Sequence, residues 1–253
     1  MCLRLKSGAR TLLIAAHPDD EVIGASTLIP RLSNLTIVHV TDGAPENLKD
    51  AQEHGFDCCE AYSRARRDEL LAALHAAGAL DVRLVELGVK DQKSAYNLVD
   101  LTARLLPLVE EAEQVMTHPY EGGHPDHDAC AFAARAAVQQ SASGAKLLEF
   151  TSYHAGSTGL AASEFLGDTS NVMTVELSDE ERERKRKACA CFKTQAQTLK
   201  YFPIAVERFR PAPDYDFTQP PHEGRLFYEN YDWGMTSGSF CKLASEAIRE
   251  LRL

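Results

Sequence analysis

Apolar residues along this chain occur either in short continuous runs or at helical spacing. The run at residues 11–16, Thr-Leu-Leu-Ile-Ala-Ala, is typical of a strand buried on both faces, whereas Leu70, Leu71 and Leu74 mark one face of a helix. Runs of the first kind predict strands at 11–16, 35–40, 82–87, 115–117, 146–153 and 172–177. Segments of the second kind predict helices at 20–32, 60–77, 96–112, 125–140 and 178–197. Polar segments predict loops at 44–59 and 88–94.

The repeated order of strand and helix predicts an α/β fold. Strands that alternate with helices form a mostly parallel sheet, and right-handed crossovers make it doubly wound, with helices on both faces. A length of 253 residues suits one large domain, so we expect residues 1–253 to fold as a single unit. Its core spans about 10–197, and an irregular, aromatic-rich C-terminal extension spans about 198–253.

The charge balance limits the classes of partner. The chain has 27 basic and 37 acidic residues, a net charge of −10, which repels nucleic acid and anionic lipid. We therefore expect a small-molecule partner and no nucleic acid. The basic cluster at 182–187 follows acidic residues 179–181, which favours a solvated helix face. A homo-oligomer is compatible with this composition.

Cysteine usage and hydropathy predict a cytoplasmic protein. The seven cysteines include no Cys-x-x-Cys pair, which favours a reducing compartment. The apolar run at 12–16 is too short for a signal peptide, and no stretch approaches the ~20 apolar residues of a membrane span. We therefore expect no membrane span.

Histidines and carboxylates gather directly after the predicted strands. His17-Pro-Asp19-Asp20-Glu21 follows the first strand, Asp42 follows the second, and His124-Pro-Asp126-His127 follows the fourth. In an open parallel sheet, ligands bind beyond the carboxyl ends of the strands. The two histidine-rich segments are therefore expected to meet at one edge.

This set of side chains is what a catalytic divalent metal site needs. His17, Asp20 and His127 can supply three ligands and leave a position for water, whose pKa falls to about 7 on zinc. Asp19 can act as the general base, and His124 can stabilise an oxyanion or protonate a leaving amine. Asp126 can hydrogen-bond a histidine and raise its basicity. Zinc is expected, although another divalent ion could occupy two imidazoles and a carboxylate.

Each segment alone has a simpler interpretation as a helix cap. Asp19 or Asp20 could cap the helix that follows, and Pro125 suits the first turn of the next one. A cap needs only one polar residue, however, and both segments carry several. Their joint position after buried strands therefore favours a functional site.

The two segments resemble the PIG-L/LmbE-like family of zinc-dependent N-deacetylases. The similarity rests on residues 16–21 and 123–127, and extends to 40–43 and 66–69, so it covers roughly residues 10–155. It implies a Rossmann-like sheet, metal ligands at His17, Asp20 and His127, a general base at Asp19, and an electrostatic or acid histidine at His124. Arg66 would lie on the substrate side or position a loop.

The resemblance also implies the reaction, which is hydrolysis of the N-acetyl or longer N-acyl group of an amino-sugar conjugate. Some family members carry a tyrosine just before the second segment, where this chain has Gly122-Gly123. The nearest tyrosine, Tyr120, could contact substrate or be structural, and Asp42 is a further candidate for substrate binding. Two alternatives stay open: a hydrolase of a different amide or ester, and a sugar- or metal-binding module without turnover.

Overall fold

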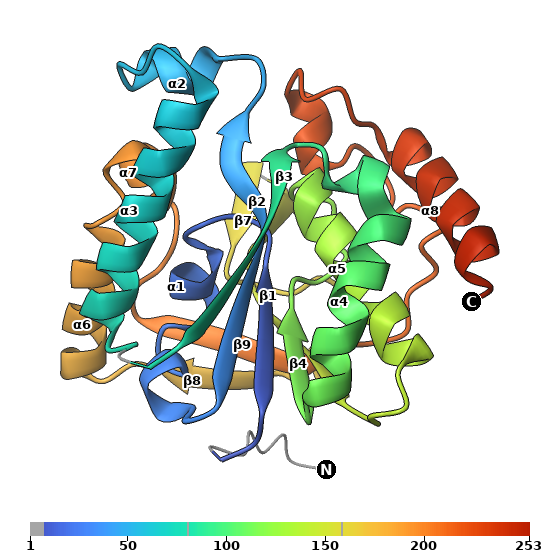
Figure 1. The fold of residues 1–253 in the computed structure, drawn as a ribbon, viewed down its shortest axis with the longest axis horizontal. Coiled ribbons are helices and arrows are strands. Elements are labelled where there is room, and N and C mark those ends of the chain that lie inside the picture. Colours follow the sequence, from blue (N-terminus) through green and yellow to red (C-terminus); the bar gives the residue numbers. More distant parts are fainter. Residues whose placement is uncertain (1–7, 80, 158) are drawn as a thin grey trace.

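The computed structural model of the chain describes residues 8–79, 81–157 and 159–253. A seven-stranded sheet runs through the centre, with the strand order β3-β2-β1-β4-β5-β9-β8, and a hairpin of β6 and β7 lies beside it (Figure 1). The strands are β1 (Thr11–Ala15), β2 (Leu35–Pro45), β3 (Arg83–Asp91), β4 (Gln114–Thr117), β5 (Lys146–Phe150), β6 (Tyr153–Gly156), β7 (Gly159–Ala162), β8 (Met173–Glu176) and β9 (Val206–Pro211).

Helices cover both faces of this sheet (Figure 1). They are α1 (Asp20–Ala25), α2 (Lys49–Glu53), α3 (Cys59–Ala77), α4 (Leu98–Glu111), α5 (Pro125–Gln140), α6 (Asp179–Cys189), α7 (Ala196–Leu199) and α8 (Ser237–Leu251). Short 3₁₀ turns connect some of them: η1 (Ile29–Arg31), η2 (Ser94–Asn97), η3 (Lys193–Gln195) and η4 (Phe227–Asn230).

The direction of the strands brings the chemistry-bearing segments together. The five adjacent strands β3, β2, β1, β4 and β5 run parallel to one another. Strand β9 is antiparallel to both β5 and β8. Because β1 and β4 are adjacent and parallel, the segments that follow them leave the sheet at the same edge. The α/β class and the mostly parallel sheet expected from the sequence are confirmed.

Strand β1 contributes to hydrophobic cores on both faces. Leu13 and Ala15 pack with residues of α1 and α3 on one face, and Leu12 and Ile14 pack with α4 and α5 on the other. Neighbouring side chains of a strand point to opposite faces, so a continuous apolar run is required when both faces are covered. The run at 11–16 was a reliable predictor of this strand for that reason.

Several predicted boundaries are wrong. Strand β2 continues to Pro45, and α2 occupies part of the expected loop at 44–59. The strand predicted at 146–153 ends at Phe150, and a separate strand, β6, begins at Tyr153. The helix predicted at 178–197 is α6 followed by a turn, η3 and α7.

The C-terminal extension is more regular than expected. It contributes β9 to the main sheet, between β5 and β8, and a fifteen-residue helix, α8. Phe240, Ala244 and Ala247 of α8 pack with Leu226 and Tyr228 in a third hydrophobic core. The extension therefore pairs with the main sheet and shares a hydrophobic core with α5. Among the described residues, no helix is both long and apolar enough to cross a bilayer.

Candidate metal centre

The turn from β1 into α1 directs two side chains toward one point. The backbone N–H of His17 donates to Asp20 Oδ2 over 2.8 Å, and His17 Nδ1 lies 3.3 Å from the same oxygen. Both residues are buried. The turn itself therefore places an imidazole nitrogen beside a carboxylate.

The third predicted ligand comes from the first turn of α5. His127 Nε2 lies 3.3 Å from Asp20 Oδ1, and His127 Nδ1 is 3.2 Å from the hydroxyl of Ser152. Donor atoms of His17, Asp20 and His127 lie within 4.8 Å of one another. The structure therefore brings the three residues together, although they come from segments more than 100 positions apart.

These residues fit a divalent cation. His127 Nε2 is buried, and its 3.3 Å contact with Asp20 Oδ1 lacks the geometry of a hydrogen bond, so the atom stays available to a ligand. Two imidazole nitrogens and a carboxylate are a common donor set for zinc and related ions. The buried group is thus able to hold a metal, and nothing in its geometry specifies which one.

Asp19 adopts a strained backbone conformation beside this group. Its φ is +148°, in a region that non-glycine residues rarely occupy and that costs about 1–3 kcal/mol. The guanidinium of Arg66 donates to Asp19 Oδ2 over 3.2 Å and to the carbonyls of Pro18 and Gly43 over 3.0 and 3.1 Å. Arg66 is buried next to the predicted base. Its hydrogen bonds hold the segment after β1 against the last part of β2.

The environment of Asp19 changes its acidity. Burial, together with the nearby charge of Asp20, raises the pKa of Asp19 to about 8, although Arg66 opposes the shift. The carboxyl group of Asp19 therefore holds a proton more readily than a free aspartate does.

Two more carboxylates surround the other nitrogen of His17. His17 Nε2 lies 3.2 Å from Asp91 Oδ1 and 3.3 Å from Asp126 Oδ2. Burial opposes the charged form of His17, but Asp91, Asp126 and Asp20 outweigh it and raise its pKa well above the usual range. Such carboxylates orient a ligand imidazole and increase its basicity. Asp126 also accepts the backbone N–H groups of Gln92 (2.6 Å) and Ser94 (2.9 Å).

Asp91 was missed by the sequence reasoning. It is the last residue of β3, so it occupies the same sheet edge as His17. The rule that found the other residues, a polar side chain at the carboxyl end of a strand, would have found Asp91 if the end of the third strand had been placed correctly. The predicted strand ended at residue 87 instead.

His124 is the N-cap of α5, and its tautomer is fixed by that role. The backbone N–H of Asp126 donates to His124 Nδ1 over 3.1 Å, so the proton of the neutral ring is on Nε2. Burial, and then the charge of His17, lower the pKa of His124 well below its usual range. Its ring lies edge-on to that of His17, with 4.5 Å between centroids. His124 is therefore positioned to donate a hydrogen bond as a neutral imidazole.

A further histidine, His118, supports the predicted ligands. Its ring stacks on that of His127 with 4.0 Å between centroids and 4° between planes. His118 Nε2 accepts the backbone N–H of Ala16 over 3.1 Å and lies 3.3 Å from Asp20 Oδ2. Burial lowers the pKa of His118 to about 4, so the ring is neutral. It restricts the rotation of the His127 side chain.

The two remaining predicted residues lie apart from this group. Asp42 is half-buried and forms an ion pair of 2.6 Å with Lys90. Tyr120 is buried among aromatic side chains, including Phe217 and Phe240, and its hydroxyl donates to the carbonyl of Gln219 over 2.9 Å. Among the described residues, neither belongs to the group of donor atoms formed by His17, Asp20 and His127.

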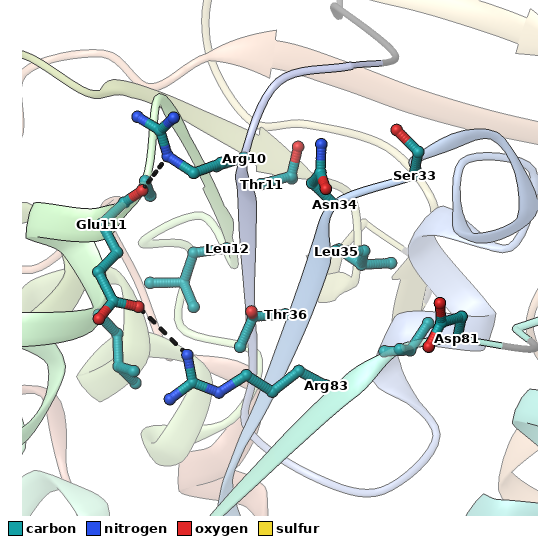
Figure 2. Close-up of a pocket in the computed structure, with 13 residues that line it drawn as sticks. Arg10, Thr11, Leu12, Ser33, Asn34, Leu35, Thr36, Asp81, Arg83 and Glu111 are labelled. Carbon is teal, nitrogen blue, oxygen red and sulfur yellow. Dashed lines mark hydrogen bonds and ion pairs between the residues drawn. The ribbon is translucent and has the colours of Figure 1, made fainter.

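A separate hollow of about 430 Å³ opens at the opposite edge of the sheet, at the amino ends of β1, β2 and β3 (Figure 2). The guanidinium of Arg83 lies 3.2 Å from Glu111, and Arg10 Nε donates to the backbone carbonyl of Glu111 over 2.6 Å. None of its lining residues, all of which are described, is a histidine or a cysteine. Ligand sites of parallel sheets lie at the other edge, so this hollow is not the candidate site.

Comparison with known proteins gives a family. The family model of GlcNAc-PI de-N-acetylase, PIG-L, matches residues 12–138. That match is half of the chain, and it includes both histidine-rich segments.

Curated relatives come from Bacillus. A probable N-acetyl-alpha-D-glucosaminyl L-malate deacetylase 2 of Bacillus subtilis is 29% identical over 125 residues, which are 47% of this chain and 56% of the relative. The protein of the same name from Bacillus cereus is 27% identical over 135 residues, or 51% of this chain and 60% of that protein. The matches thus span little more than half the length of these relatives.

Solved structures share the fold. The deacetylase of the teicoplanin biosynthesis pathway, in complex with teicoplanin, superimposes with a TM-score of 0.61 at 16% identity, covering 80% of this chain and 97% of that one. The deacetylase of A40926 pseudoaglycone gives a TM-score of 0.59 at 20% identity, covering 80% and 96%. At such identities the likeness concerns the fold alone. The family match and the two motifs it contains lead to the conclusion that this chain belongs to the PIG-L family.

Proposed function

We propose that this protein is a metal-dependent hydrolase that removes the N-acyl group from an N-acylated amino sugar or its conjugate. The observation that carries the proposal is the convergence of His17, Asp20 and His127 within 4.8 Å, with Asp19 held beside them by Arg66. A binding module would need the three ligands only. An additional carboxylate, buried, strained at its backbone and held by Arg66, is a costly feature that catalysis explains.

In this proposal His17, Asp20 and His127 hold one divalent ion, preferably zinc. When bound, such an ion polarises an acyl carbonyl and makes water a better nucleophile at neutral pH. The other nitrogen of His17 keeps its hydrogen bonds to Asp91 and Asp126, which fix the ring that binds the ion.

The protein's own residues then move one proton. Asp19, bonded to Arg66 through Oδ2, accepts the proton of the attacking water at Oδ1. His124 donates from Nε2–H to the carbonyl oxygen as negative charge develops there. Asp19 returns the proton to the amine nitrogen as the carbon–nitrogen bond breaks. A neutral His124 is sufficient, because it acts as a hydrogen-bond donor and not as the acid.

Substrate contacts are proposed at the polar side of the site. Arg66 lies on α3 and donates to the carbonyls of Pro18, after β1, and Gly43, in the last part of β2. Asp42 is next to Gly43, so both side chains are proposed to face the edge where a sugar would approach. The curated Bacillus relatives are named for an N-acetylglucosaminyl malate. An N-acetylglucosamine conjugate is therefore the substrate class to test first.

The test measures release of free amine from an N-acetylglucosamine conjugate. Three samples are compared: the untreated protein, the protein with a chelator, and the chelated protein after zinc is restored. We expect activity that the chelator removes and zinc restores. Asp19→Asn should bind zinc as the wild type does and lose about 10²–10⁴ of turnover, since it removes a general base and not a ligand. Full zinc content without amine release in the wild type would support a binding module instead.

A further inference from the structure

Four aromatic side chains form a continuous chain of contacts between the two histidines of the α5 motif. These residues, called the aromatic arc below, are Tyr153, Phe227, Tyr231 and Trp233. Ring centroids are 5.3 Å apart for His127 and Tyr153, and 4.6 Å apart for Trp233 and His124. Within the arc, the successive distances are 5.4 Å from Tyr153 to Phe227, 5.5 Å from Phe227 to Tyr231, and 4.5 Å from Tyr231 to Trp233.

Two glycines hold the arc against the segment that leads into α5. The backbone N–H of Phe227 donates to the carbonyl of Gly122 over 2.9 Å. A Cβ atom at Gly123 would lie 1.9 Å from the carbonyl oxygen of Tyr153, so only glycine permits this close approach. The Gly122-Gly123 pair therefore holds Tyr153 and Phe227 against the segment that carries His124 and His127.

The arc leaves part of its ring surface uncovered, although Tyr153 also packs against the first core and Trp233 against the third. Tyr231 is 47% exposed, and Tyr153, Phe227 and Trp233 are only partly buried. Nearby aromatics of the third core, such as Tyr228 and Phe240, are completely buried. Exposed rings in contact with catalytic imidazoles are typical of a surface that an apolar ligand covers.

The remaining neighbours of the metal centre are polar, and they are called the polar side below. His17 contacts Asp91 and Asp126 there, and Asp19 contacts Arg66. The two substituents of a planar trans amide point in opposite directions. A sugar has many hydroxyl groups that need hydrogen-bond partners, whereas an acyl chain has none, so the two halves of the substrate suit the two sides.

We propose that the aromatic arc is a subsite for the acyl group, and that the enzyme prefers unbranched acyl chains longer than acetyl. This inference rests on the proposed hydrolase function. An acetyl methyl group is too small to cover four rings, whereas each added methylene can bury more of their surface. Each buried methylene is worth about fourfold in kcat/KM, or about fifteenfold from acetyl to butanoyl.

The first experiment is a ladder of N-acylglucosamines, from acetyl through propanoyl and butanoyl to hexanoyl, with the zinc-loaded protein. The measured quantity is the ratio of kcat/KM for butanoyl to that for acetyl. Tyr231→Ala should reduce this ratio severalfold, and Tyr231→Phe should preserve it. Tyr201→Ala is the matched control, because Tyr201 is a 69% exposed aromatic outside the arc, and it should keep the wild-type ratio.

The second experiment measures binding without turnover. Trp233 is the only tryptophan of the chain, so tryptophan fluorescence reports on the arc alone. In zinc-loaded Asp19→Asn, N-butanoylglucosamine should shift this emission and bind about fifteenfold more tightly than N-acetylglucosamine. Equal affinity for the two ligands contradicts an acyl subsite.

The outcomes separate this inference from the proposed function. If acetyl is released and longer chains are cleaved no better, the acyl subsite is wrong while the hydrolase stands. If Tyr231→Ala lowers kcat/KM equally for every chain length, the arc stacks on the sugar, which also overturns the inference. If no acyl group is released from any member of the ladder, the proposed function itself fails.

Discussion

The two sides of the metal centre are built from different parts of the chain and depend on different physical chemistry. The polar side consists of buried charges, His17, Asp19, Asp20 and Asp91, all within the segment that matches the family model. The aromatic arc begins at Tyr153, beyond that segment, and contains no ionisable group of the metal-binding type. In the proposed function, proton transfer would thus depend on the segment that matches the family model, whereas the proposed acyl surface lies beyond that segment.

The two sides also differ in how precisely they must be built. A buried carboxylate or imidazole tolerates little displacement, because every unpaired polar atom costs free energy. Each charged residue is accordingly held by several contacts, such as the three that Arg66 donates. Aromatic packing is less directional, so the arc can vary while the charged side stays the same.

The largest effect is expected from removing one of the proposed metal ligands. His127→Ala eliminates one of three donors, and we expect at least a 100-fold loss of zinc affinity, together with most of the activity. Zinc content after dialysis measures the first effect, and amine release measures the second. His75→Ala, an exposed histidine near the end of α3, should keep both at wild-type levels. Full zinc occupancy in His127→Ala would remove His127 from the ligand set.

A smaller effect is expected where the segment before α5 contacts β6. Gly123→Ala places a Cβ atom 1.9 Å from the Tyr153 carbonyl oxygen, so β6 must move away from the motif loop. We expect a loss of about 1–3 kcal/mol in the free energy of unfolding, or roughly 2–10 °C in Tm. Gly238→Ala is the matched control, since a Cβ atom there meets nothing within 4 Å.

Thermal unfolding followed by circular dichroism measures both glycine variants. Gly238 lies in α8, so alanine should leave Tm unchanged or raise it slightly. If Gly123→Ala melts at the wild-type temperature, the contact between the loop and β6 is not rigid. In that case the aromatic arc is not fixed relative to His124 and His127.

The meeting of His17, Asp20 and His127 could be predicted for a simple reason. His17 and Asp20 follow one apolar run, the segment after the neighbouring parallel strand leads into the helix that carries His127, and parallel strands bring such segments to one edge of the sheet. The arc could not be predicted in the same way. Phe227, Tyr231 and Trp233 lie in an irregular segment, and only the tertiary structure shows which aromatic residues there contact the histidines.

Strand β9 was missed because its charged residues are buried. Its sequence, Val-Glu-Arg-Phe-Arg-Pro, has no apolar run, yet Glu207 and Arg210 are 1% and 5% exposed. Glu207 pairs with Lys185 at 2.9 Å, and Arg210 pairs with Glu149 at 2.8 Å. The expectation that residues 182–187 form a solvated face is accordingly wrong for Lys185, whose partner could not be identified from local sequence.

Another buried ionisable group, Glu121, lies in the loop that precedes His124. Its carboxyl group accepts hydrogen bonds from Arg210 and from the backbone N–H of Leu166. Burial raises the pKa of Glu121 from 4.5 to about 8, although Arg210 opposes the shift. Its Oε2 atom has no hydrogen-bond partner among the described residues. Glu121 lines a cavity of about 370 Å³, so water can enter as the group ionises.

The smallest effect is therefore a change in the pH dependence of stability. Between pH 4.5 and 8 the folded state binds a proton at Glu121 that the unfolded state has lost, so the free energy of unfolding falls as pH rises through this window. Glu121→Gln keeps the accepting oxygen and cannot ionise, so the fall in the free energy of unfolding should be smaller by about 1 kcal/mol. The difference is no larger because water that enters the cavity stabilises the ionised carboxylate. Urea unfolding at pH 5.5 and 8.5 measures the difference, with the exposed-site variant Glu110→Gln as control. An equal fall in Glu121→Gln and wild type would show that Glu121 is already ionised at pH 5.5, and that the loop behind the metal centre carries its charge without a cost to folding.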